Sequence, residues 1–339
     1  MCIRDRDITL MQDGVSVDTV RSYFGMRSIT ISQGNILLNG KPLYQRLVLD
    51  QGFYPTGVIT APDDAQLRGD IERSLALGFN GARMHQKVFE ARYLYWADRM
   101  GYLLWGEYPN WGLNVENGEG LLSFADEWRE ILTRDLSSPS VIGWCPFNET
   151  SLRTDLYLLQ TVYRMTKTLD PTRLVIDTSG WVHCDETDVF DYHDYEQDPA
   201  VFRAHVEQYA ASQSGKPFVH VPGLFPYMHQ TPREIIGNGQ PIFISEFGGI
   251  GWNAQEDNAN AWGYGANPHT EEAWLTRLGG LLDAVLRTPG ICGFCYTQLT
   301  DVEQEINGVY TYDRRAKFDV NQIRALVARP AWCETGEVR

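Results

Sequence analysis

Two apolar runs carry a glutamate at their polar end: Val141-Ile142-Gly143-Trp144-Cys145-Pro146-Phe147-Asn148-Glu149 and Pro241-Ile242-Phe243-Ile244-Ser245-Glu246-Phe247-Gly248-Gly249. Continuous apolar runs of this length are typical of strands buried on both faces, as in a parallel sheet. Because an unpaired carboxylate is costly to bury, each glutamate should lie where its strand leaves the core. Two strands with the same ending indicate one site that is built from several strand ends.

The rest of the chain repeats this plan. Apolar, strand-like segments alternate with amphipathic helical stretches such as 63–77, 89–100 and 271–286. The predicted strands are 43–49, 78–84, 102–107, 141–148, 174–178, 189–193, 241–246 and 290–298. Strands that alternate with helices form parallel β-α units, and eight of them favour closure into a (β/α)8 TIM barrel, an α/β fold.

Residues 1–40 have a different pattern. Apolar and polar residues alternate around Tyr23 and Ile29, and Asn39-Gly40 is typical of a hairpin turn. We therefore predict a short N-terminal β extension, followed by the barrel over residues 41–330 and a C-terminal tail over 331–339. The chain of 339 residues is long enough for one barrel of about 250 residues with extensions.

Charge limits the partners of the protein. The chain has 29 basic and 44 acidic residues, for a net charge of −15, and no basic stripe. This composition disfavours nucleic acid and anionic membrane surfaces as partners. No run approaches the roughly 18 apolar residues of a membrane helix. An acidic chain accepts a neutral ligand more easily than a polyanion, and the oligomeric state stays open.

The cysteines and the N-terminus bear on the compartment. The six cysteines are spread over the chain without a framework of spacings, which favours free thiols in a reducing compartment. No apolar segment follows Met1–Arg6, so these residues contain no secretory signal. We therefore expect a cytoplasmic protein.

The paired glutamates indicate the chemistry. Glycoside hydrolysis needs one carboxyl group to protonate the leaving oxygen and a second to attack the anomeric carbon. Glu149 and Glu246 form the pair, and the amide of Asn148 could bind a ring hydroxyl. Arg83 would keep a neighbouring carboxylate ionised, as a nucleophile requires, and Tyr195 could donate to the same group. The sequence thus predicts a retaining glycoside hydrolase that acts by double displacement. We expect a small oligosaccharide or glycoside as its partner.

Other polar and aromatic residues lie at or beyond the predicted strand ends. Trp181 and Trp252 could stack on sugar rings, although most tryptophans are core residues. The strand-end residues added as substrate contacts are Asp50, His85, Glu107 and His193. Each of them alone could equally be an ordinary strand-end charge or a core histidine.

Two other kinds of protein were weighed. The stretch Trp181–Glu186, followed by His193-Asp194, is rich in metal-ligand residue types, as a metal-dependent hydrolase would require. However, no H-E-x-x-H helix occurs and no His-x-His closes the first strand, so we predict no metal and no cofactor. A carbohydrate-binding pseudoenzyme is the other alternative.

Several short motifs occur in a familiar order: Gly40-Lys41-Pro42-Leu43, Arg83-Met84-His85, Trp105-Gly106-Glu107, Asn148-Glu149 and Ser245-Glu246-Phe247-Gly248. Together they resemble the catalytic barrel of glycoside hydrolase family 2, over residues 20–325. That family contains β-galactosidases, β-glucuronidases and β-mannosidases, with glutamates at the ends of the fourth and seventh strands.

The resemblance implies a role for each matching residue. Glu149 would be the acid/base and Glu246 the nucleophile that forms a glycosyl-enzyme intermediate. Arg83, Asn148 and Tyr195 would hold the nucleophile and the 2-hydroxyl of the sugar. Residues that would contact the terminal sugar are Asp50, His85, Glu107 and His193.

Three departures from the family pattern carry further expectations. The family has a jelly roll and an immunoglobulin-like domain before the barrel, and residues 1–40 resemble only the remnant of the latter and the lead-in. Tyr296 replaces a tryptophan that lies under the sugar in many relatives. The segment Glu305–Tyr310 lacks the lysine with which β-glucuronidases read a carboxylate. We therefore expect a β-galactosidase-like specificity ahead of β-glucuronidase or β-mannosidase.

Overall fold

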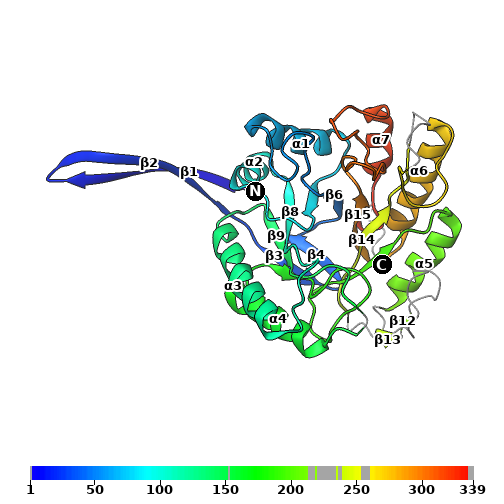
Figure 1. The fold of residues 1–339 in the computed structure, drawn as a ribbon, viewed down its shortest axis with the longest axis horizontal. Helices are drawn as coiled ribbons and strands as arrows, with labels where there is room; N and C mark the ends of the chain where they lie inside the picture. Colours follow the sequence, from blue (N-terminus) through cyan, green and yellow to red (C-terminus); the bar gives the residue numbers. More distant parts are fainter. Residues whose placement is uncertain are drawn as a thin grey trace.

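The computed structural model describes residues 2–151, 153–212, 218–219, 234–235, 239–252 and 260–334. At its centre is one parallel sheet with the strand order β10-β9-β8-β7-β6-β15-β14-β11 (Figure 1). Its strands are β6 (Gln45–Asp50), β7 (Gly81–Met84), β8 (Leu103–Glu107), β9 (Val141–Cys145), β10 (Leu174–Val175), β11 (Phe190–Asp194), β14 (Ile242–Gly248) and β15 (Ile291–Thr297). Each predicted strand overlaps one of these, and the predicted α/β class is confirmed.

The two edge strands of this sheet, β10 and β11, come together. The backbone N–H of Asp188, just before β11, donates to the carbonyl of Val175 in β10 at 2.9 Å. The N–H of His193, within β11, donates to the carbonyl of Gly180, which follows β10, at 3.3 Å. The sheet therefore curls until its edges are joined, and the carboxyl ends of all its strands meet at one mouth.

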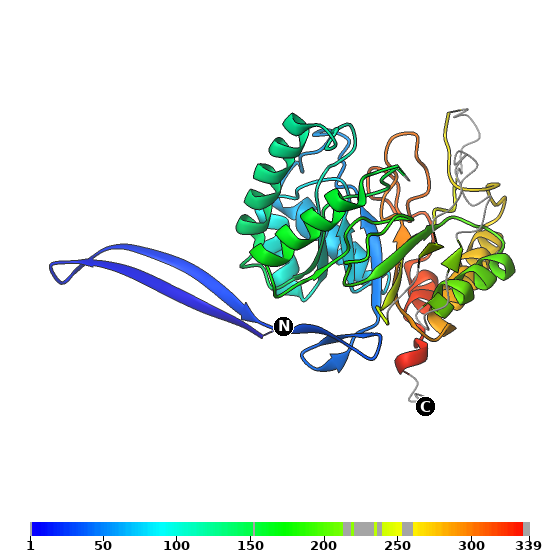
Figure 2. The same cartoon turned by 90° about the horizontal axis from the view of Figure 1, so that it is seen from below.

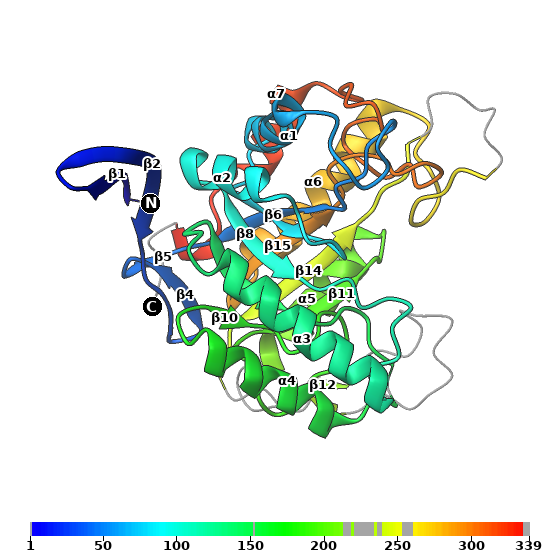
Figure 3. The same ribbon diagram turned by 60° about the vertical axis from the view of Figure 1, so that its left-hand side comes forward.

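Helices cover the outside of the sheet. They are α1 (Asp64–Ala76), α2 (Ala91–Met100), α3 (Gly118–Asp135), α4 (Leu156–Leu169), α5 (Pro199–Ser212), α6 (Glu271–Arg287) and α7 (Val320–Val327), followed by a 3-10 turn, η1 (Trp332–Glu334). Figure 3 shows α3 and α4 packed side by side, with α1 and α7 together on another part of the barrel. Side-chain oxygens of Asp63, Asn117 and Thr270 cap α1, α3 and α6, which explains where these helices begin.

The side chains of each strand alternate between two layers. One cluster fills the inside of the barrel and the other lies between the sheet and the helices. In β6, for example, Leu47 and Leu49 belong to the inner cluster, whereas Val48 belongs to the outer one. A residue at the end of a strand therefore reaches the mouth only if its side chain lies on the face of the strand that points into the barrel, as Leu47 and Leu49 do in β6.

Residues 2–42 form two further sheets. The long hairpin of β1 (Cys2–Gln12) and β2 (Val15–Met26) projects away from the barrel (Figure 2). The strands β3 (Ile29–Ser32), β4 (Asn35–Leu38) and β5 (Lys41–Pro42) form a small antiparallel sheet. Ile29 and Ile36 of this sheet join the inner cluster, so they close the end of the barrel opposite the mouth. A short antiparallel pair, β12 (Phe218–Val219) and β13 (Glu234–Ile235), completes the described strands.

Two features of the outer surface are separate from the mouth. Within the described part of the chain, no helix combines the length and apolar character needed to cross a bilayer.

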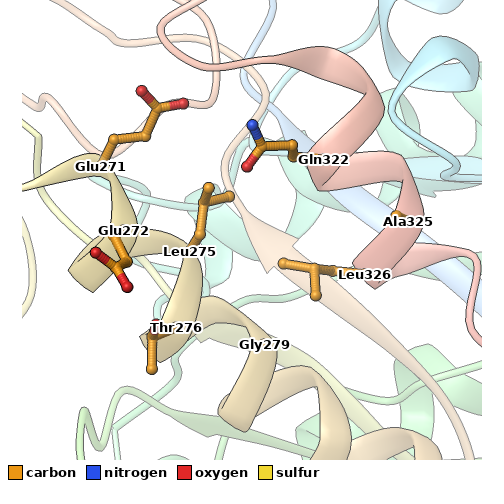
Figure 4. A pocket seen from close by; sticks show the side chains of 8 residues that line it. All are labelled: Glu271, Glu272, Leu275, Thr276, Gly279, Gln322, Ala325 and Leu326. Atoms are coloured by element: carbon orange, nitrogen blue, oxygen red, sulfur yellow. The ribbon is translucent and has the colours of Figure 1, made fainter.

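A groove of about 730 Å³ lies between α6 and α7, with Leu275 and Leu326 facing each other and two glutamates at one end (Figure 4). None of the strand-end residues lines this groove.

Candidate active site

Glu246 is held from two sides at the mouth of the barrel. Its Oε1 accepts a hydrogen bond from Nη1 of Arg83 at 3.0 Å, and its Oε2 accepts one from the hydroxyl of Tyr195 at 2.6 Å. Glu246 is 4% exposed and Arg83 is 1% exposed. A buried cation and a hydroxyl donor thus fix both oxygens of one carboxylate.

Arg83 organises the groups around Glu246. Its Nε donates to Glu107 at 2.7 Å, its Nη2 to the amide oxygen of Asn148 at 2.9 Å, and its Nη1 also to the carbonyl of Ser245 at 2.8 Å. Burial works against the charge of Arg83, but Glu107 and Glu246 outweigh it and raise the pKa of the guanidinium well above its ordinary value. The positive charge beside Glu246 is therefore permanent.

Glu149 lies on a turn rather than within a strand. Its φ of +52° is in the left-handed region, which is uncommon for a residue with a side chain and marks a constrained position. The backbone N–H of Glu149 donates to the carbonyl of Ser179 at 2.8 Å, and its Oε1 lies 2.9 Å from Nδ1 of His193. The turn therefore aims this carboxylate across the mouth at β11.

The two glutamates are close to each other. One oxygen of Glu149, one oxygen of Glu246 and one ring nitrogen of His193 all lie within 4.8 Å of one another. Retaining glycosidases have their two carboxyl groups about 5–5.5 Å apart, and inverting ones about 6.5–9.5 Å. The observed separation matches the shorter spacing.

His193 is hydrogen-bonded at both ring nitrogens. Its Nε2 lies 2.8 Å from Oγ of Ser179, which gives its own proton to Asp191 at 2.5 Å. Because that oxygen accepts from Nε2 while Glu149 accepts from Nδ1, both nitrogens donate, as in an imidazolium. Burial opposes this charge, but Glu246 and the bond to Glu149 raise the pKa of His193. Conversely, burial opposes ionisation of Glu149, but His193 lowers its pKa.

A second histidine supports this arrangement from below. Nδ1 of His183 lies 2.7 Å from Asp177, and its Nε2 lies 3.2 Å from a carboxylate oxygen of Asp191. Burial opposes protonation of His183, but the two aspartates raise its pKa to about 10. Asp191 is thereby held between a cation and Ser179, which fixes the chain of contacts that ends at Glu149.

Comparison with known proteins settles the family. The family model "Glycosyl hydrolases family 2, TIM barrel domain" matches residues 29–249, well over half of the chain. The chain belongs to glycosyl hydrolase family 2. The resemblance predicted from the short motifs is confirmed.

Individual relatives of this family 2 barrel are distant. The chain is 29% identical over 171 residues to a β-glucuronidase of Rattus norvegicus, covering 46% of this chain and 25% of the relative. It is 28% identical over 188 residues to a β-galactosidase of Vibrio cholerae, covering 53% of this chain and 18% of the relative. The chain thus spans about a quarter or less of the length of these two relatives.

Solved structures show the same fold. A family 2 β-galacturonidase from Eisenbergiella tayi bound to galacturonate superposes with a TM-score of 0.73 at 22% identity, covering 92% of this chain and 56% of that one. A β-D-glucuronidase of Dictyoglomus thermophilum gives a TM-score of 0.74 at 20% identity, covering 96% and 57%. At this identity the likeness concerns the fold alone.

Most of the predicted site residues of the family 2 barrel lie around the two glutamates. His85 lies 3.1 Å from Glu107 and 3.9 Å from Glu246. The half-buried indole of Trp181 donates to the carbonyl of Thr150 at 3.1 Å and packs edge-on against His193. Nδ2 of Asn148 is buried and has no hydrogen-bond partner among the described residues, so it is a donor without an acceptor at the mouth.

Three predicted residues lie elsewhere. Asp50 has the outward parity of β6, and its carboxylate accepts from the N–H of Gly52 and the hydroxyl of Tyr93 in α2. Tyr296 has the outward parity of β15 and packs against Phe247 in the outer cluster. Trp252 packs against Phe318, with ring centroids 5.3 Å apart. We correct the placement of Asp50 and Tyr296, because a shift of one residue along a strand moves a side chain to the other face.

Three neighbours of the site were not predicted. Ser179 links His193 to Asp191, and the ring of Tyr264 stacks on that of Tyr195 with centroids 3.5 Å apart. Glu305 is half-buried and accepts from Gln51 and Asn307. Burial raises the pKa of Glu305, while its hydrogen bonds to Asn307 and Gln51 act in the opposite direction.

The residues of the suggested metal site do not converge. Both ring nitrogens of His183 are occupied by aspartates, and Glu186 pairs with Arg164 on α4. Across the described residues, the one group of three that could share an ion is Glu149, His193 and Glu246. The permanent cation of Arg83 at 3.0 Å from Glu246 opposes a second cation there.

Proposed function

We propose that this family 2 barrel is a retaining glycoside hydrolase that cleaves terminal β-linked sugars. The observation that carries the proposal is the asymmetric pair at the mouth. Glu246 faces a permanent cation, whereas Glu149 faces a histidine that can gain or lose a proton, and the two carboxylates lie within 4.8 Å. A nucleophile needs the first environment and an acid/base needs the second.

In the first step, a carboxylate oxygen of Glu246 attacks the anomeric carbon. The bond from that carbon to the leaving oxygen breaks, its electron pair stays on the oxygen, and the oxygen takes a proton from Glu149. The protonated form of Glu149 can come from His193, since the two groups share one proton across a 2.9 Å hydrogen bond. The product is a glycosyl ester of Glu246.

In the second step, water attacks the anomeric carbon and gives a proton to Glu149. The ester bond breaks and its electron pair returns to Glu246. While Glu246 is esterified its negative charge is absent, so ionised Glu149 has one anion fewer beside it. This change favours the basic form of Glu149 in the step that needs a base.

Neighbouring groups have roles in the same proposal. The donor of Asn148 without a partner would bind the 2-hydroxyl, and Tyr195 and Arg83 would orient the nucleophile. His85, Glu107, His193 and the indole of Trp181 would contact the terminal sugar or hold the groups that do.

We propose a neutral glycone, with β-galactosides first. Glu305 occupies the segment in which a uronate reader would need a lysine, and an anion there disfavours a substrate carboxylate. A uronide is the second candidate, because the solved neighbours include enzymes named for glucuronate and galacturonate. A β-mannosidase-like specificity completes the alternatives.

The division of the chain is also a proposal. Residues 41–330 would be a closed (β/α)8 barrel, residues 331–339 a tail, and residues 1–40 the remnant of an immunoglobulin-like domain with its lead-in. The antiparallel strands β1 to β5 support the last of these. The free thiols of Cys145, Cys184, Cys292, Cys295 and Cys333 support a cytoplasmic location.

Substrate profiling tests the function. The chain should hydrolyse at least one of a panel of aryl β-glycosides, and E246G should lower turnover on the order of 10⁴-fold or more. Azide should rescue E246G with an α-glycosyl azide as product, since it would attack directly from the face of the missing nucleophile. Unchanged activity of E246G would disprove the assignment, and sugar binding without any turnover would favour the pseudoenzyme.

A further inference from the structure

A cavity of about 390 Å³ lies beside Glu149, outside the charged cluster. Among the described residues that line it, Glu149 is the one member of that cluster, because Arg83, Tyr195 and Glu246 do not contribute. Its apolar lining consists of Trp111, Leu113, Val115, Phe147 and Leu159. The cavity therefore shares the proposed acid/base with the catalytic mouth but does not share the proposed nucleophile.

The loop that forms one wall is anchored to the catalytic turn. Oδ1 of Asn110 accepts from the N–H of Asn148 at 2.9 Å, and its Nδ2 donates to the carbonyl of Asn148 at 3.1 Å. Gln86 donates to the same Asn110 at 2.7 Å and accepts from the N–H of Trp111 at 3.1 Å. The position of Trp111 is thus tied to the peptide that precedes Glu149, and the wall is built before any ligand arrives.

Trp111 presents an uncovered aromatic surface. Its side chain is 56% exposed, although its edge contacts His85 with centroids 5.4 Å apart. An indole left in water at a strand-end loop is an apolar surface that a planar ligand can cover. The indole lies between the charged mouth and the cavity, since it contacts His85 on one side and lines the cavity on the other.

The polar groups of the lining are largely used within the protein. The amide of Asn110 makes the three bonds given above, the hydroxyl of Thr150 bonds to Thr178, and the hydroxyl of Ser151 accepts from a backbone N–H. The side-chain oxygen of Asn114 also accepts from a backbone N–H of its own loop. Glu116, which is exposed at the rim, and Thr154 are the other polar residues of the lining. A second sugar ring would bring hydroxyls that need several free partners, whereas an aromatic ring needs none.

We propose that this cavity is the leaving-group subsite and that it selects an apolar, aromatic aglycone stacked on Trp111. The inference rests on the proposed function, because Glu149 must reach the glycosidic oxygen from which the leaving group extends. A group attached to that oxygen extends past Glu149, which lines this cavity, and away from the anomeric carbon that Glu246 attacks. The substrate class is then an aryl β-glycoside rather than an oligosaccharide.

Three donors with the same sugar test the subsite: a nitrophenyl β-glycoside, the β-linked disaccharide and the β-glycosyl fluoride. A fluoride leaving group has no ring that could stack on Trp111, so kcat/KM for the glycosyl fluoride reports the catalytic groups alone. We expect W111A to lower kcat/KM for the aryl glycoside about 10-fold or more and to change the fluoride less than about twofold. W111F should recover most of the loss, and wild type should prefer the aryl glycoside over the disaccharide.

The matched control is Y157A, because Tyr157 is 78% exposed on α4 and does not line this cavity. It should leave the rates of all donors unchanged. Equal losses on aryl glycoside and fluoride would overturn the proposal, since Trp111 would then act on the sugar or on folding. A larger loss on the disaccharide would also overturn it, in favour of a second sugar. No turnover of any donor by wild type would instead contradict the proposed function itself.

Discussion

The turn that carries Glu149 and the strand that carries Glu246 differ in how they hold a carboxylate. Glu246 lies within β14, its oxygens fixed by a guanidinium whose charge never changes and by a tyrosine hydroxyl. Glu149 lies beyond β9 in a left-handed conformation and meets a histidine that can titrate. One carboxylate has a constant electrostatic environment, while the environment of the other changes with the proton on its neighbour.

This difference separates the two proposed roles better than the sequence can. Both glutamates end an apolar run, so their local patterns are alike. The two glutamates differ only in their partners, Arg83 from β7 and His193 from β11. These partners distinguish a carboxylate that must stay ionised from one that must gain and lose a proton. Four substitutions should each remove one part of this difference between the two carboxylates.

Of these four changes, removal of Glu149 should have the largest effect, and the effect should depend on the leaving group. E149A should lower the first step on the order of 10³-fold for substrates with poor leaving groups, because these need the proton most. Dinitrophenyl glycosides, which leave without a proton, should lose far less in that step. Azide should then give a β-glycosyl azide, the opposite anomer from that of E246G. Product NMR measures this, and the same anomer from both variants would contradict the assignment.

Removing the fixed cation should affect stability. R83M leaves Glu107 and Glu246 buried without their partner, so we expect about 3–5 kcal/mol less stability toward unfolding in urea. Adding E107Q to R83M should recover part of that loss, since it removes one of the unpaired charges. R129M is the control, because Arg129 pairs with Asp126 on the exposed face of α3 and should matter little. Similar losses in R83M and R129M would show that Arg83 is not the organising charge.

The sequence predicted the inward-facing residues well, and the reason is local. Arg83, His85 and Glu107 are polar residues at the ends of short apolar segments, and their alternation on the strand survives in the structure. The same rule misplaced Asp50, because it depends on which face of the strand each residue occupies, and an error of one residue reverses the face. Tyr296 was assigned instead from the resemblance to the family, and its side chain also packs in the outer cluster. Val48 and Asp50 share the outward parity of β6, which no local pattern distinguishes from the inward one.

Partners supplied by loops could not be predicted. Tyr264 reaches Tyr195 from the long connection after β14, and Ser179 reaches His193 from the turn after β10. Neither lies in an apolar run, and the path of a loop depends on contacts with distant parts of the chain. The leaving-group cavity has the same origin, since its wall is the loop after β8. Strand ends are readable from one sequence, whereas loop positions require the fold.

A smaller effect, in pH rather than in rate, should follow from His193. In wild type the alkaline limb of kcat/KM reports loss of the proton shared by Glu149 and His193, and the raised pKa of His193 places that loss at higher pH. In H193Q the glutamine can still donate a hydrogen bond to Glu149, but it cannot supply a proton. Activity should then require Glu149 itself to stay protonated, so the alkaline limb should move to lower pH. If His193 only lowered the pKa of Glu149, its removal would move the limb to higher pH, and the two outcomes are opposite in sign.

The smallest effect should come from Ser179, whose hydroxyl contacts the carboxylate of neither Glu149 nor Glu246. Its hydroxyl oxygen accepts from Nε2 of His193 and its proton goes to Asp191, so S179A removes one of the two acceptors that stabilise the imidazolium. We expect the alkaline limb to shift to lower pH by less than about one unit, with kcat/KM at the optimum reduced about threefold. S74A is the control, since Ser74 is equally buried but bonds to Tyr102 in the outer layer. If the alkaline limb of kcat/KM moves as far in S179A as in H193Q, the proton that is supplied to Glu149 depends on the whole chain of contacts from Asp191 to Glu149. If the limb does not move, that proton depends on the pair of His193 and Glu149 alone.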